Sequence, residues 1–492
     1  MDLRSGVVPA TRIDCRAPRD GSEQAICDLL TLPPTALELG RRFAAAGHEL
    51  HVVGGTVRDL ILGRSAHTPD LDFATDARPE DVQRLLEGWA AETWDAGIAF
   101  GTVGGVRDGV RVEITTYRAE SYDRESRNPQ VAYGASLDDD LARRDFTVNA
   151  MAVSVPDLVF ADPYGGLRDL AAGVLRTPAA PEVSFGDDPL RMVRAARFVS
   201  ALGLRPVPEV IGAMTAMAAR LEIVAPERVR DEFLKLVAGV DPVAGLEVLV
   251  NTGLCEFIIP ELPAMKLSID EHHQHKDVYV HSLTVLEQAV ALEDRLPGGG
   301  PDLVVRLAAL LHDIGKPSTK KLMSGGKVSF HKHELVGARM ARTRLRALHV
   351  PKDIAGPVVD LISLHLRFHG YGEQAWTDSA VRRYVTDAGD QLERLHVLTR
   401  SDCTTRNQRK AARLAKAYDA LEERIVRLSA EEDLRAIRPE LDGNAIMRIL
   451  DLPPGPLIGK AYAHLLEFRL EVGLVGPDAA EAELRRWAAA HQ

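Results

Sequence analysis

The sequence predicts an α+β protein with a small, mostly antiparallel sheet near its start and helices along the rest of the chain. Up to about residue 170, short apolar runs alternate with glycine-rich turns, a pattern typical of strands. Beyond that point the strand pattern fades and apolar residues recur at helical spacing. The 492 residues are enough for about three domains of roughly 150 residues each.

Turn residues bound each predicted element of the first third. Strands are predicted at residues 49–53, 70–75, 99–106, 109–118 and 147–155. Gly54-Gly55 makes a turn after the first strand, and the following TVRDLILGR predicts a short helix that ends at Gly63. Asp108-Gly109 is a typical hairpin turn, so the two strands that flank it are expected to pair.

Changes in pattern divide the chain into five parts. Residues 1–35 are mixed in charge and are predicted to be a flexible leader. Residues 36–170 form the α/β head, and residues 171–265 a helical neck. Residues 266–405 are predicted to be a helical domain with clustered histidines, and residues 406–492 a charged helical tail.

Composition favours a cytoplasmic protein without a membrane anchor. The chain is 46% apolar and 27% charged, as in ordinary globular proteins, and contains no run of about 18 apolar residues. Its N-terminus lacks the apolar region of a secretory signal. The cysteines lie far apart without paired spacing, so we expect neither a disulfide framework nor a thiolate zinc site. They are Cys15, Cys27, Cys255 and Cys403.

Two basic segments stand out from an acidic background. The formal net charge of −11 argues against a general polyanion-binding protein. Residues 316–352 nevertheless carry ten Lys or Arg and one acid, and residues 400–416 carry six against Asp402. Such local surfaces suit a specific nucleic-acid partner, although each segment alone fits a solvated helix face equally well.

The stretch PDLDFAT contains two carboxylates that would share one face of a strand. Side chains alternate along a strand, so Asp70 and Asp72 point the same way and repel each other unless a cation lies between them. Glu113 can project from a neighbouring strand toward the same position. Three acids from two strands suit Mg²⁺ and two-metal nucleotidyl transfer, whereas the pair alone also fits an exposed strand face.

Glycines and basic residues near these acids are suited to phosphate binding. Gly54 and Gly55 precede a helix, so backbone N–H groups can approach a phosphate, and Arg58 lies one turn into that helix. In RRDFTVNA, Arg144 can contact phosphate or base, and Asp145 can accept a hydrogen bond from a ribose hydroxyl. These residues predict a phosphate-bearing nucleotide as ligand.

Charged residues along DDPLRMVRAARF can read a base edge. Asp188, Arg191, Arg194 and Arg197 recur every three residues and would form one stripe of a helix. A carboxylate accepts from the amino group of cytosine or adenine, and a guanidinium donates to the adjacent ring nitrogen. Uracil and guanine present a carbonyl oxygen instead, so one Asp–Arg pair would accept C and A alone. In isolation the stripe also fits an ion-pair ladder on a surface helix.

These motifs, in this order, resemble the bacterial class II CCA-adding tRNA nucleotidyltransferases, which have a DNA-polymerase-β-like head. The match covers roughly residues 36–265, including PERVRDEFLKLV, which resembles the helix that closes the family's neck. The resemblance implies Mg²⁺ on Asp70 and Asp72, with Glu113 as the third acid. It implies nucleotide binding by Gly54, Gly55, Arg58, Arg144, Asp145, Asp188, Arg191, Arg194 and Arg197. Asp187 departs from the family's usual Glu.

Four residues of the histidine-rich region resemble the metal site of the HD phosphohydrolase superfamily. His281, the doublet His312-Asp313 and the distant Asp402 match the family's ligands, and extra histidines between them can hold a second metal. Imidazole and carboxylate ligands suit a transition metal or Mg²⁺ that activates water on a phosphoester. A degenerate structural domain is the alternative.

The leading hypothesis is an enzyme that adds C, C and A to the 3′ end of tRNA from CTP and ATP and releases pyrophosphate. The helical regions would bind the acceptor arm through phosphate contacts. Relatives that add only A or only CC, or that make poly(A), share the same motifs and stay open as alternatives. A phosphohydrolase acting through the HD site is a further hypothesis, and the intact acids argue against a catalytically silent RNA-binding protein.

Overall fold

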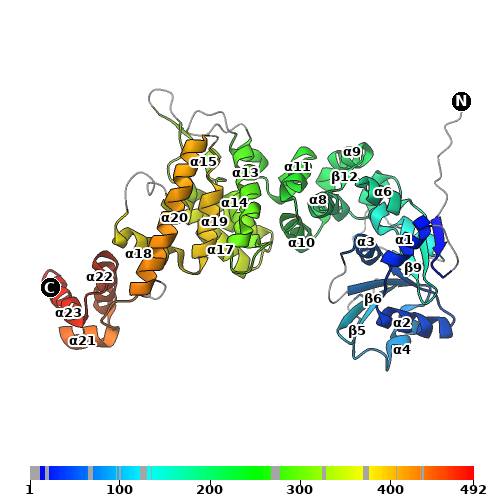
Figure 1. The fold of residues 1–492 in the computed structure, drawn as a ribbon, viewed down its shortest axis with the longest axis horizontal. Helices are drawn as coiled ribbons and strands as arrows, with labels where there is room; N and C mark the ends of the chain where they lie inside the picture. The colour runs from blue at the N-terminus through cyan, green and yellow to red at the C-terminus, as the bar shows by residue number, and fades with distance from the viewer. Residues whose placement is uncertain are drawn as a thin grey trace. The chain divides into compact units, whose positions relative to one another are not determined.

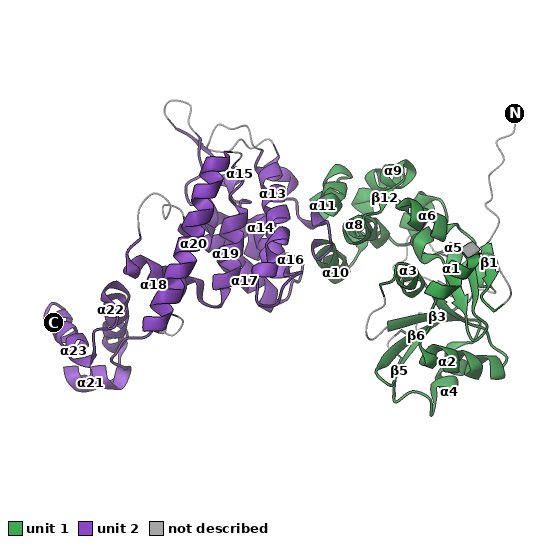
Figure 2. Cartoon of the chain, in the orientation of Figure 1, with its two compact units in different colours: residues 1–236, 244–257 green, residues 237–243, 258–492 purple. Residues whose placement is uncertain are grey.

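The computed structural model describes residues 11–16, 21–64, 70–95, 97–98, 101–121, 130–133, 136–266, 277–323, 328–368, 376–405, 407–432, 434 and 437–491. The chain divides into two compact units (Figure 2). Unit 1 is residues 1–236 with 244–257, and unit 2 is residues 237–243 with 258–492. Strands of one large sheet occur in unit 1 and helices dominate unit 2, so the α+β prediction is confirmed.

Unit 1 is built on a mixed sheet that has eight strands among the described residues (Figure 1). Its order is β1-β10-β9-β2-β3-β6-β5-β4, and every neighbouring pair is antiparallel except β3 with β6. The strands are β1 (Thr11–Asp14), β2 (Leu50–Val53), β3 (Asp70–Thr75), β4 (Glu92–Trp94), β5 (Thr102–Arg107), β6 (Val110–Thr116), β9 (Ala152–Ser154) and β10 (Val159–Asp162). A separate hairpin pairs β7 (Arg118–Ser121) with β8 (Gln130–Tyr133).

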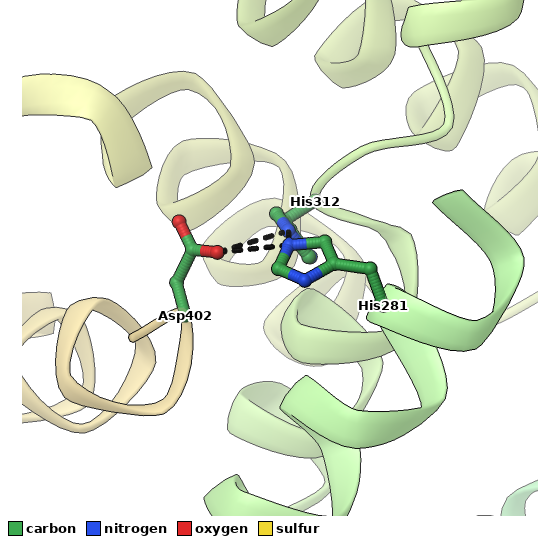
Figure 3. Close-up of side chains that lie close together, drawn as sticks. All are labelled: His281, His312 and Asp402. Carbon is green, nitrogen blue, oxygen red and sulfur yellow. Dashed lines mark hydrogen bonds and ion pairs between the residues drawn. The ribbon is translucent and has the colours of Figure 1, made fainter. Parts of the chain in front are cut away.

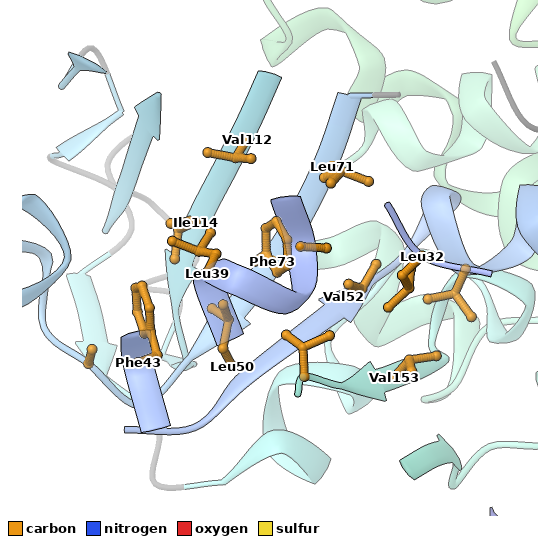
Figure 4. Packing of buried hydrophobic residues seen from close by; sticks show 14 of the residues in the cluster. Leu32, Leu39, Phe43, Leu50, Val52, Leu71, Phe73, Val112, Ile114 and Val153 are labelled. Atoms are coloured by element: carbon orange, nitrogen blue, oxygen red, sulfur yellow. The ribbon is translucent and has the colours of Figure 1, made fainter. Parts of the chain in front are cut away.

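The core of unit 1 fixes which face of the sheet carries the acids. Apolar side chains of the sheet meet those of helix α2 (Pro34–Ala45) in one cluster (Figure 4). The cluster includes Leu39, Phe43, Leu50, Val52, Leu71, Phe73, Val112 and Ile114. In β3 the apolar residues are buried while Asp70 and Asp72 are exposed. A one-residue slip of β3 would bury both carboxylates, so the core determines the register.

Part of the expected flexible leader forms ordered elements, which corrects the prediction for residues 11–14 and 21–29. Residues 11–14 form β1, which pairs along its length with β10 and buries Ile13, and residues 21–29 form helix α1 (Gly21–Leu29). A disulfide joins Cys15 to Cys27, whose Cα atoms lie 5.4 Å apart, so the expectation of no disulfide framework is wrong for this pair. The fold brings these two cysteines together, which their spacing in sequence did not indicate.

The predicted strand at 147–155 forms only in part. Thr147–Asn149 is a turn of 3₁₀ helix, and the strand β9 covers Ala152–Ser154. The hydroxyl of Thr147 donates to Asp169 and its backbone N–H to the carbonyl of Arg176. These bonds replace the strand ladder at the start of the segment.

The remaining elements of unit 1 are helices that flank the sheet and follow it in sequence. They are α3 (Gly55–Ile61), α4 (Pro79–Leu86), α5 (Leu137–Ala142), α6 (Gly166–Ala172), α7 (Pro181–Asp187), α8 (Leu190–Leu202) and α9 (Pro208–Met217). Helices α10 (Pro226–Val237) and α11 (Pro242–Asn251) follow. The chain passes from unit 1 into unit 2 at residue 237 and back into unit 1 at residue 244. The apolar residues of α8, among them Met192, Ala195, Ala196 and Val199, are buried.

Unit 2 is mainly helical in its described residues. Its longer helices are α13 (Val278–Ala291), α14 (Leu303–Leu311), α16 (His333–Ala347), α17 (Lys352–Leu364), α18 (Asp378–Ala388), α19 (Leu392–Ser401) and α20 (Gln408–Glu431). Towards the C-terminus, α21 (Gly443–Leu450), α22 (Pro456–Val472) and α23 (Pro477–Ala489) share a small apolar cluster. Among the described residues, none of the helices is long and apolar enough to cross a membrane.

Candidate functional site

The register of β3 and β6 brings the three predicted acids together. Asp72 pairs with Glu113 and Asp70 with Arg111 across these parallel neighbours. Both aspartates are exposed and Glu113 is half-buried, on the face opposite the apolar core. Neighbouring strands lie about 4.8 Å apart, so the register puts the three acids on one face of adjacent strands, and carboxylate oxygens are ligands that hard divalent cations prefer.

The surroundings raise the pKa of Asp72 although its carboxylate stays accessible to solvent. Partial desolvation by the surrounding protein is the main cause, Arg144 acts in the opposite direction, and the charges of Glu113 and Asp70 raise the pKa further. Like charges held close together favour a cation between them. The electrostatics therefore fit a divalent metal at this position.

Two glycines let guanidinium groups approach the start of α3. Gly54 has a φ of +73°, and a Cβ there would lie 2.7 Å from Nη1 of Arg144. A Cβ at Gly55 would lie 3.4 Å from Nη2 of Arg58. A side chain at Gly54 would require a strained left-handed backbone and would displace Arg144. The absence of side chains at these glycines thus leaves room for the guanidinium groups of Arg144 and Arg58 beside the start of α3.

Arg58 is buried and bonded within the protein. Its Nε and Nη2 each donate to the carboxylate of Asp59 at 2.8 Å, and its Nη1 donates to Oδ1 of Asn149 at 2.6 Å. Its guanidinium carbon also lies 5.2 Å from the ring centroid of Phe198. The predicted phosphate-binding side chain is therefore rigidly oriented by its neighbours.

Asp140, which the sequence reasoning did not single out, anchors the arginines of RRDF. Nη2 of Arg143 lies 2.7 Å from one carboxylate oxygen, and Nη2 of Arg144 lies 3.2 Å from the other. Burial opposes ionisation of Asp140, but the two guanidinium groups outweigh it and lower the pKa. The spacing of three and four residues on a helix was the available sequence signal.

Asp145 is a buried acceptor rather than an open one. Its Oδ1 accepts from the backbone N–H of Phe146 and from Asn149, both at 2.9 Å, and its Oδ2 accepts from Nε of Arg194 at 2.9 Å. Burial opposes ionisation, but Arg194 and Asn149 outweigh it and lower the pKa of Asp145 to about 2. In the structure this carboxylate therefore orients Arg194.

Asp188 lies outside the helix on which the sequence analysis expected it. It follows α7 in an extended conformation, and α8 begins at Leu190. The reason is Pro189, because a proline disfavours helical geometry in the residue before it. Oδ1 of Asp188 accepts from the backbone N–H of Leu190 at 3.1 Å, and Oδ2 lies 2.8 Å from Nη2 of Arg228 on α10.

The side chains of Asp188 and Arg191, which are predicted to read a base together, bond to other partners in the structure. Arg191 instead donates from Nη1 to the hydroxyl of Ser184 at 2.9 Å and from Nη2 to the carbonyl of Arg143 at 2.6 Å. Both residues lie in the region expected, but each has other partners. Their joint role in reading a base stays a prediction.

Glu232 of α10 holds the other two arginines of the stripe. Nη1 of Arg194 lies 3.5 Å from Oε1 of this buried carboxylate, and Nε of Arg197 lies 2.8 Å from Oε2. Both guanidinium groups also lie over the ring of Phe198. Glu232 is 38 residues from Arg194, so helical spacing could not reveal the contact.

Unit 2 brings together the residues that resembled an HD site. Nε2 of His281 lies 3.0 Å from Oδ1 of Asp402 and 3.5 Å from Oδ2 of Asp313. Nε2 of His312 lies 3.1 Å from Oδ2 of Asp313 and 3.7 Å from Oδ1 of Asp402. Figure 3 shows His281, His312 and Asp402 pointing toward one another from separate helices. These three form one candidate metal-binding group.

Asp313, His333 and His365 form a second candidate metal-binding group. All three are buried, and Nε2 of His333 lies 3.2 Å from Oδ1 of Asp313. Lys316, which the sequence reasoning did not single out, lies 2.9 Å from Oδ2 of the same carboxylate. The two histidines were seen in sequence as extra candidates, and the helix packing supplies their position.

Hydrogen bonds orient the four histidines so that Nε2 faces the carboxylates. Nδ1 of His312, His333 and His365 lies within 2.9 Å of the carbonyls of Ala309, Phe330 and Ile362. Nδ1 of His281 lies 3.2 Å from the hydroxyl of Thr404. Such bonds at the second ring nitrogen are typical of metal-ligating histidines.

The charged residues of this cluster shift one another's pKa values. Although burial opposes it, Asp313 and Asp402 raise the pKa of His312 to about 9. His312 and Lys316 lower the pKa of Asp313 in return, against the effect of burial. Burial and the charge of His312 lower the pKa of His365 to about 3. A buried group of imidazoles and carboxylates fits a divalent cation, which would replace the shared protons.

Three family models match the chain in succession. Residues 50–176 match the poly A polymerase head domain, and residues 203–265 match a probable RNA and SrmB-binding site of polymerase A. Residues 278–428 match the HD domain. The first match contains the three acids and the glycine turn, and the third contains all six residues of the two metal-binding groups. The fold and sites thus define a nucleotidyltransferase head joined to an HD domain.

Curated relatives identify the family. The A-adding tRNA nucleotidyltransferase of Deinococcus radiodurans is 33% identical over 445 residues, which cover 89% of this chain and 95% of that protein. The CCA-adding enzyme of Levilactobacillus brevis is 40% identical over 253 residues, but the match covers only 50% of this chain and 62% of the relative. The chain belongs to the bacterial class II CCA-adding enzyme family, with an HD domain.

Solved structures share the fold. The CCA-adding enzyme of Bacillus stearothermophilus in complex with CTP matches with a TM-score of 0.64 at 24% identity, over 94% of this chain and 99% of that one. A Thermotoga maritima CCA-adding enzyme complexed with tRNA matches with a TM-score of 0.58 at 18% identity, over 96% of this chain and 99% of that one. The likeness extends over the head and the helical regions alike.

Proposed function

We propose that the chain is a tRNA nucleotidyltransferase that adds C, C and A to the 3′ end of tRNA from CTP and ATP and releases pyrophosphate. The observation that carries the proposal is the register that pairs Asp72 with Glu113 on the face that also holds Asp70. Relatives named for CCA addition, and related structures in complex with CTP, ATP and tRNA, support it. Such an enzyme would act in the bacterial cytoplasm on the tRNA acceptor arm.

Asp70, Asp72 and Glu113 would hold Mg²⁺, because carboxylate oxygens are its preferred ligands and the three acids crowd one face. When bound, two Mg²⁺ ions would neutralise the triphosphate and favour ionisation of the attacking 3′ hydroxyl. Arg58 and Arg144 would contact the triphosphate beside the glycine turn. The other residues that would bind the nucleotide are Gly54, Gly55, Asp145, Arg194 and Arg197. The rigid bonding of Arg58 would keep its remaining donors aimed at one position.

Base selection would rest on Asp188 and Arg191. A carboxylate that accepts from an amino group and a guanidinium that donates to a ring nitrogen suit cytosine and adenine and reject uracil and guanine. Addition of A alone is the main alternative, because the relative that matches nearly the whole chain is named an A-adding enzyme. Addition of CC alone and poly(A) synthesis are further alternatives with the same core motifs.

Incorporation of single labelled nucleotides tests the proposal. The full-length chain is incubated with tRNA that ends before CCA and with one labelled triphosphate at a time. We expect two C residues from CTP, and then one A when ATP is added. No incorporation from CTP, together with addition of A to tRNA that already ends in CC, would favour the A-adding alternative. Long A tails, or no incorporation from any nucleotide, would refute CCA addition.

We propose a metal-dependent phosphohydrolase activity at the HD site as a second function. The observation that favours it is the pair of metal-binding groups whose histidines are oriented through Nδ1. His281, His312, Asp313 and Asp402 would hold a divalent metal, which would supply activated water for a phosphoester. Hydrolysis of p-nitrophenyl phosphate and of 2′,3′-cyclic nucleotides, measured with added Mg²⁺, Mn²⁺, Ni²⁺ or Zn²⁺, tests it. No hydrolysis with any of these metals would favour a structural domain.

A further inference from the structure

The carboxylate of Asp188 already has a cationic partner in the structure. Its Oδ2 lies 2.8 Å from Nη2 of Arg228, which comes from α10, forty residues further along the chain. Its Oδ1 accepts from the backbone N–H of Leu190 at the start of α8. Arg191, the other predicted base-reading residue, is bonded elsewhere. Arg228 is therefore the side chain that competes for Asp188.

The two bonds to Asp188 differ in how easily they can be exchanged. The Leu190 N–H is held in place by the first turn of α8, so this donor stays beside Oδ1 of Asp188. The Arg228 side chain is 56% exposed and that of Asp188 is 24% exposed, so the guanidinium can swing into solvent. Oδ2, the oxygen that Arg228 leaves, can then accept from a ligand.

We propose that Arg228 is a positioning residue that holds Oδ2 of Asp188 in the free enzyme and is exchanged for the amino group of an incoming cytosine or adenine. The inference rests on the proposed nucleotidyltransferase function and extends it to a residue outside the predicted base-reading pair. An amino group donates to a carboxylate as a guanidinium does, so C and A can replace Arg228. The carbonyl oxygen of uracil or guanine cannot, and displacement of Arg228 then leaves Oδ2 of Asp188 without a donor.

The expected effect is a change in nucleotide affinity without a change in the chemical step. Arg228 opposes CTP and ATP alike before chemistry, so its removal should lower KM for both and leave kcat unchanged. Solvent-exposed ion pairs change an equilibrium by at most about fivefold, which bounds the effect. For Arg228→Ala we therefore expect KM for both CTP and ATP to fall about two- to fivefold.

Steady-state addition by the full-length chain tests the proposal, with CTP on tRNA that ends before CCA and ATP on tRNA that ends in CC. Arg230→Ala is the matched control, because Arg230 lies on the same helix and pairs with Asp231. We expect Arg230→Ala and the conservative Arg228→Lys to keep the wild-type KM, and both alanine variants to keep the wild-type melting temperature. In an Asp188→Ala background, Arg228→Ala should have no further effect on KM.

The outcomes separate this inference from the function on which it rests. A wild-type chain that adds neither C nor A overturns the proposed function and the inference with it. Normal wild-type addition with an unchanged or raised KM in Arg228→Ala overturns the inference alone. A lowered KM that persists in the Asp188→Ala background also overturns it, because the effect would then not pass through Asp188.

Discussion

Replacing Asp145 by Asn should destabilise unit 1 by about 2 kcal/mol at neutral pH. The carboxylate is 8% exposed and bonded to Arg194 and Asn149. Burial opposes ionisation, but these partners lower its pKa from 3.8 to about 2. One pKa unit corresponds to about 1.4 kcal/mol, so a fall from 3.8 to about 2 corresponds to roughly 2 kcal/mol of stabilisation. Asn keeps the shape of the side chain and removes the charge that Arg194 requires.

Tryptophan fluorescence can follow unit 1 separately. Trp89 and Trp94 belong to unit 1, whereas Trp376 and Trp487 belong to unit 2. In a Trp376→Phe/Trp487→Phe background, urea denaturation therefore reports on unit 1. The matched control is Asp157→Asn, because the side chains of Asp157 and Arg16 form an ion pair at 69% and 52% exposure. We expect this control to shift the free energy of unfolding by less than about 0.5 kcal/mol.

The stability difference between the wild type and Asp145→Asn should also depend on pH. A carboxyl group whose pKa is lowered by folding stabilises the native state above its unfolded pKa, and this stabilisation is lost as the pH falls through the folded pKa. The difference between the wild type and Asp145→Asn should thus be constant from pH 7 to about 5 and shrink between about 4 and 2. A difference below about 0.5 kcal/mol at pH 7, or one independent of pH, would refute the assignment.

Further predictions concern the two sites and the core. Asp70→Ala should reduce nucleotide addition by about 100-fold or more while HD hydrolysis persists, and His312→Ala should do the reverse; loss of both activities in either variant would mean that the sites are not independent. Gly54→Ala should raise KM for CTP, because its Cβ would meet Arg144 at 2.7 Å; an unchanged KM would contradict a phosphate role for the turn. Phe73→Ala should destabilise unit 1 by about 3–5 kcal/mol in urea denaturation; a loss below about 1 kcal/mol would contradict its place in the core.

Local alternation was enough to predict how the head presents its acids. The apolar residues of DLDFAT require one face of the strand to be buried, which leaves Asp70 and Asp72 together on the other face. The same alternation in RVEITTYR put Glu113 on one face of β6. The register between the two strands depends on tertiary packing, and the structure supplies it by pairing Asp72 with Glu113.

Local sequence patterns did not predict the contacts between segments that are distant in the chain. Glu232 and Arg228 lie on a helix that the sequence identified, but the ion pairs that they make follow from how α10 packs near α8. Pro189 was visible in sequence, and its effect on Asp188 was nevertheless underestimated because the charge spacing fitted a continuous helix. The disulfide between Cys15 and Cys27 depends on the pairing of β1, a four-residue strand.

Different backbone features orient the side chains of the two candidate sites: paired strands in the head and helix ends in unit 2. In the head, the pleat of two paired strands directs the carboxylates to one face, so the apolar core sets their direction. In unit 2, His312 and His365 each follow the last turn of a helix and bond through Nδ1 to the carbonyl three residues earlier, one that helix termini leave without an intrahelical partner. The helix end therefore fixes the imidazole without a further side chain. This explains why the His-Asp doublet directly follows an apolar helix, and substitutions that shorten α14 should therefore disturb the candidate metal-binding group.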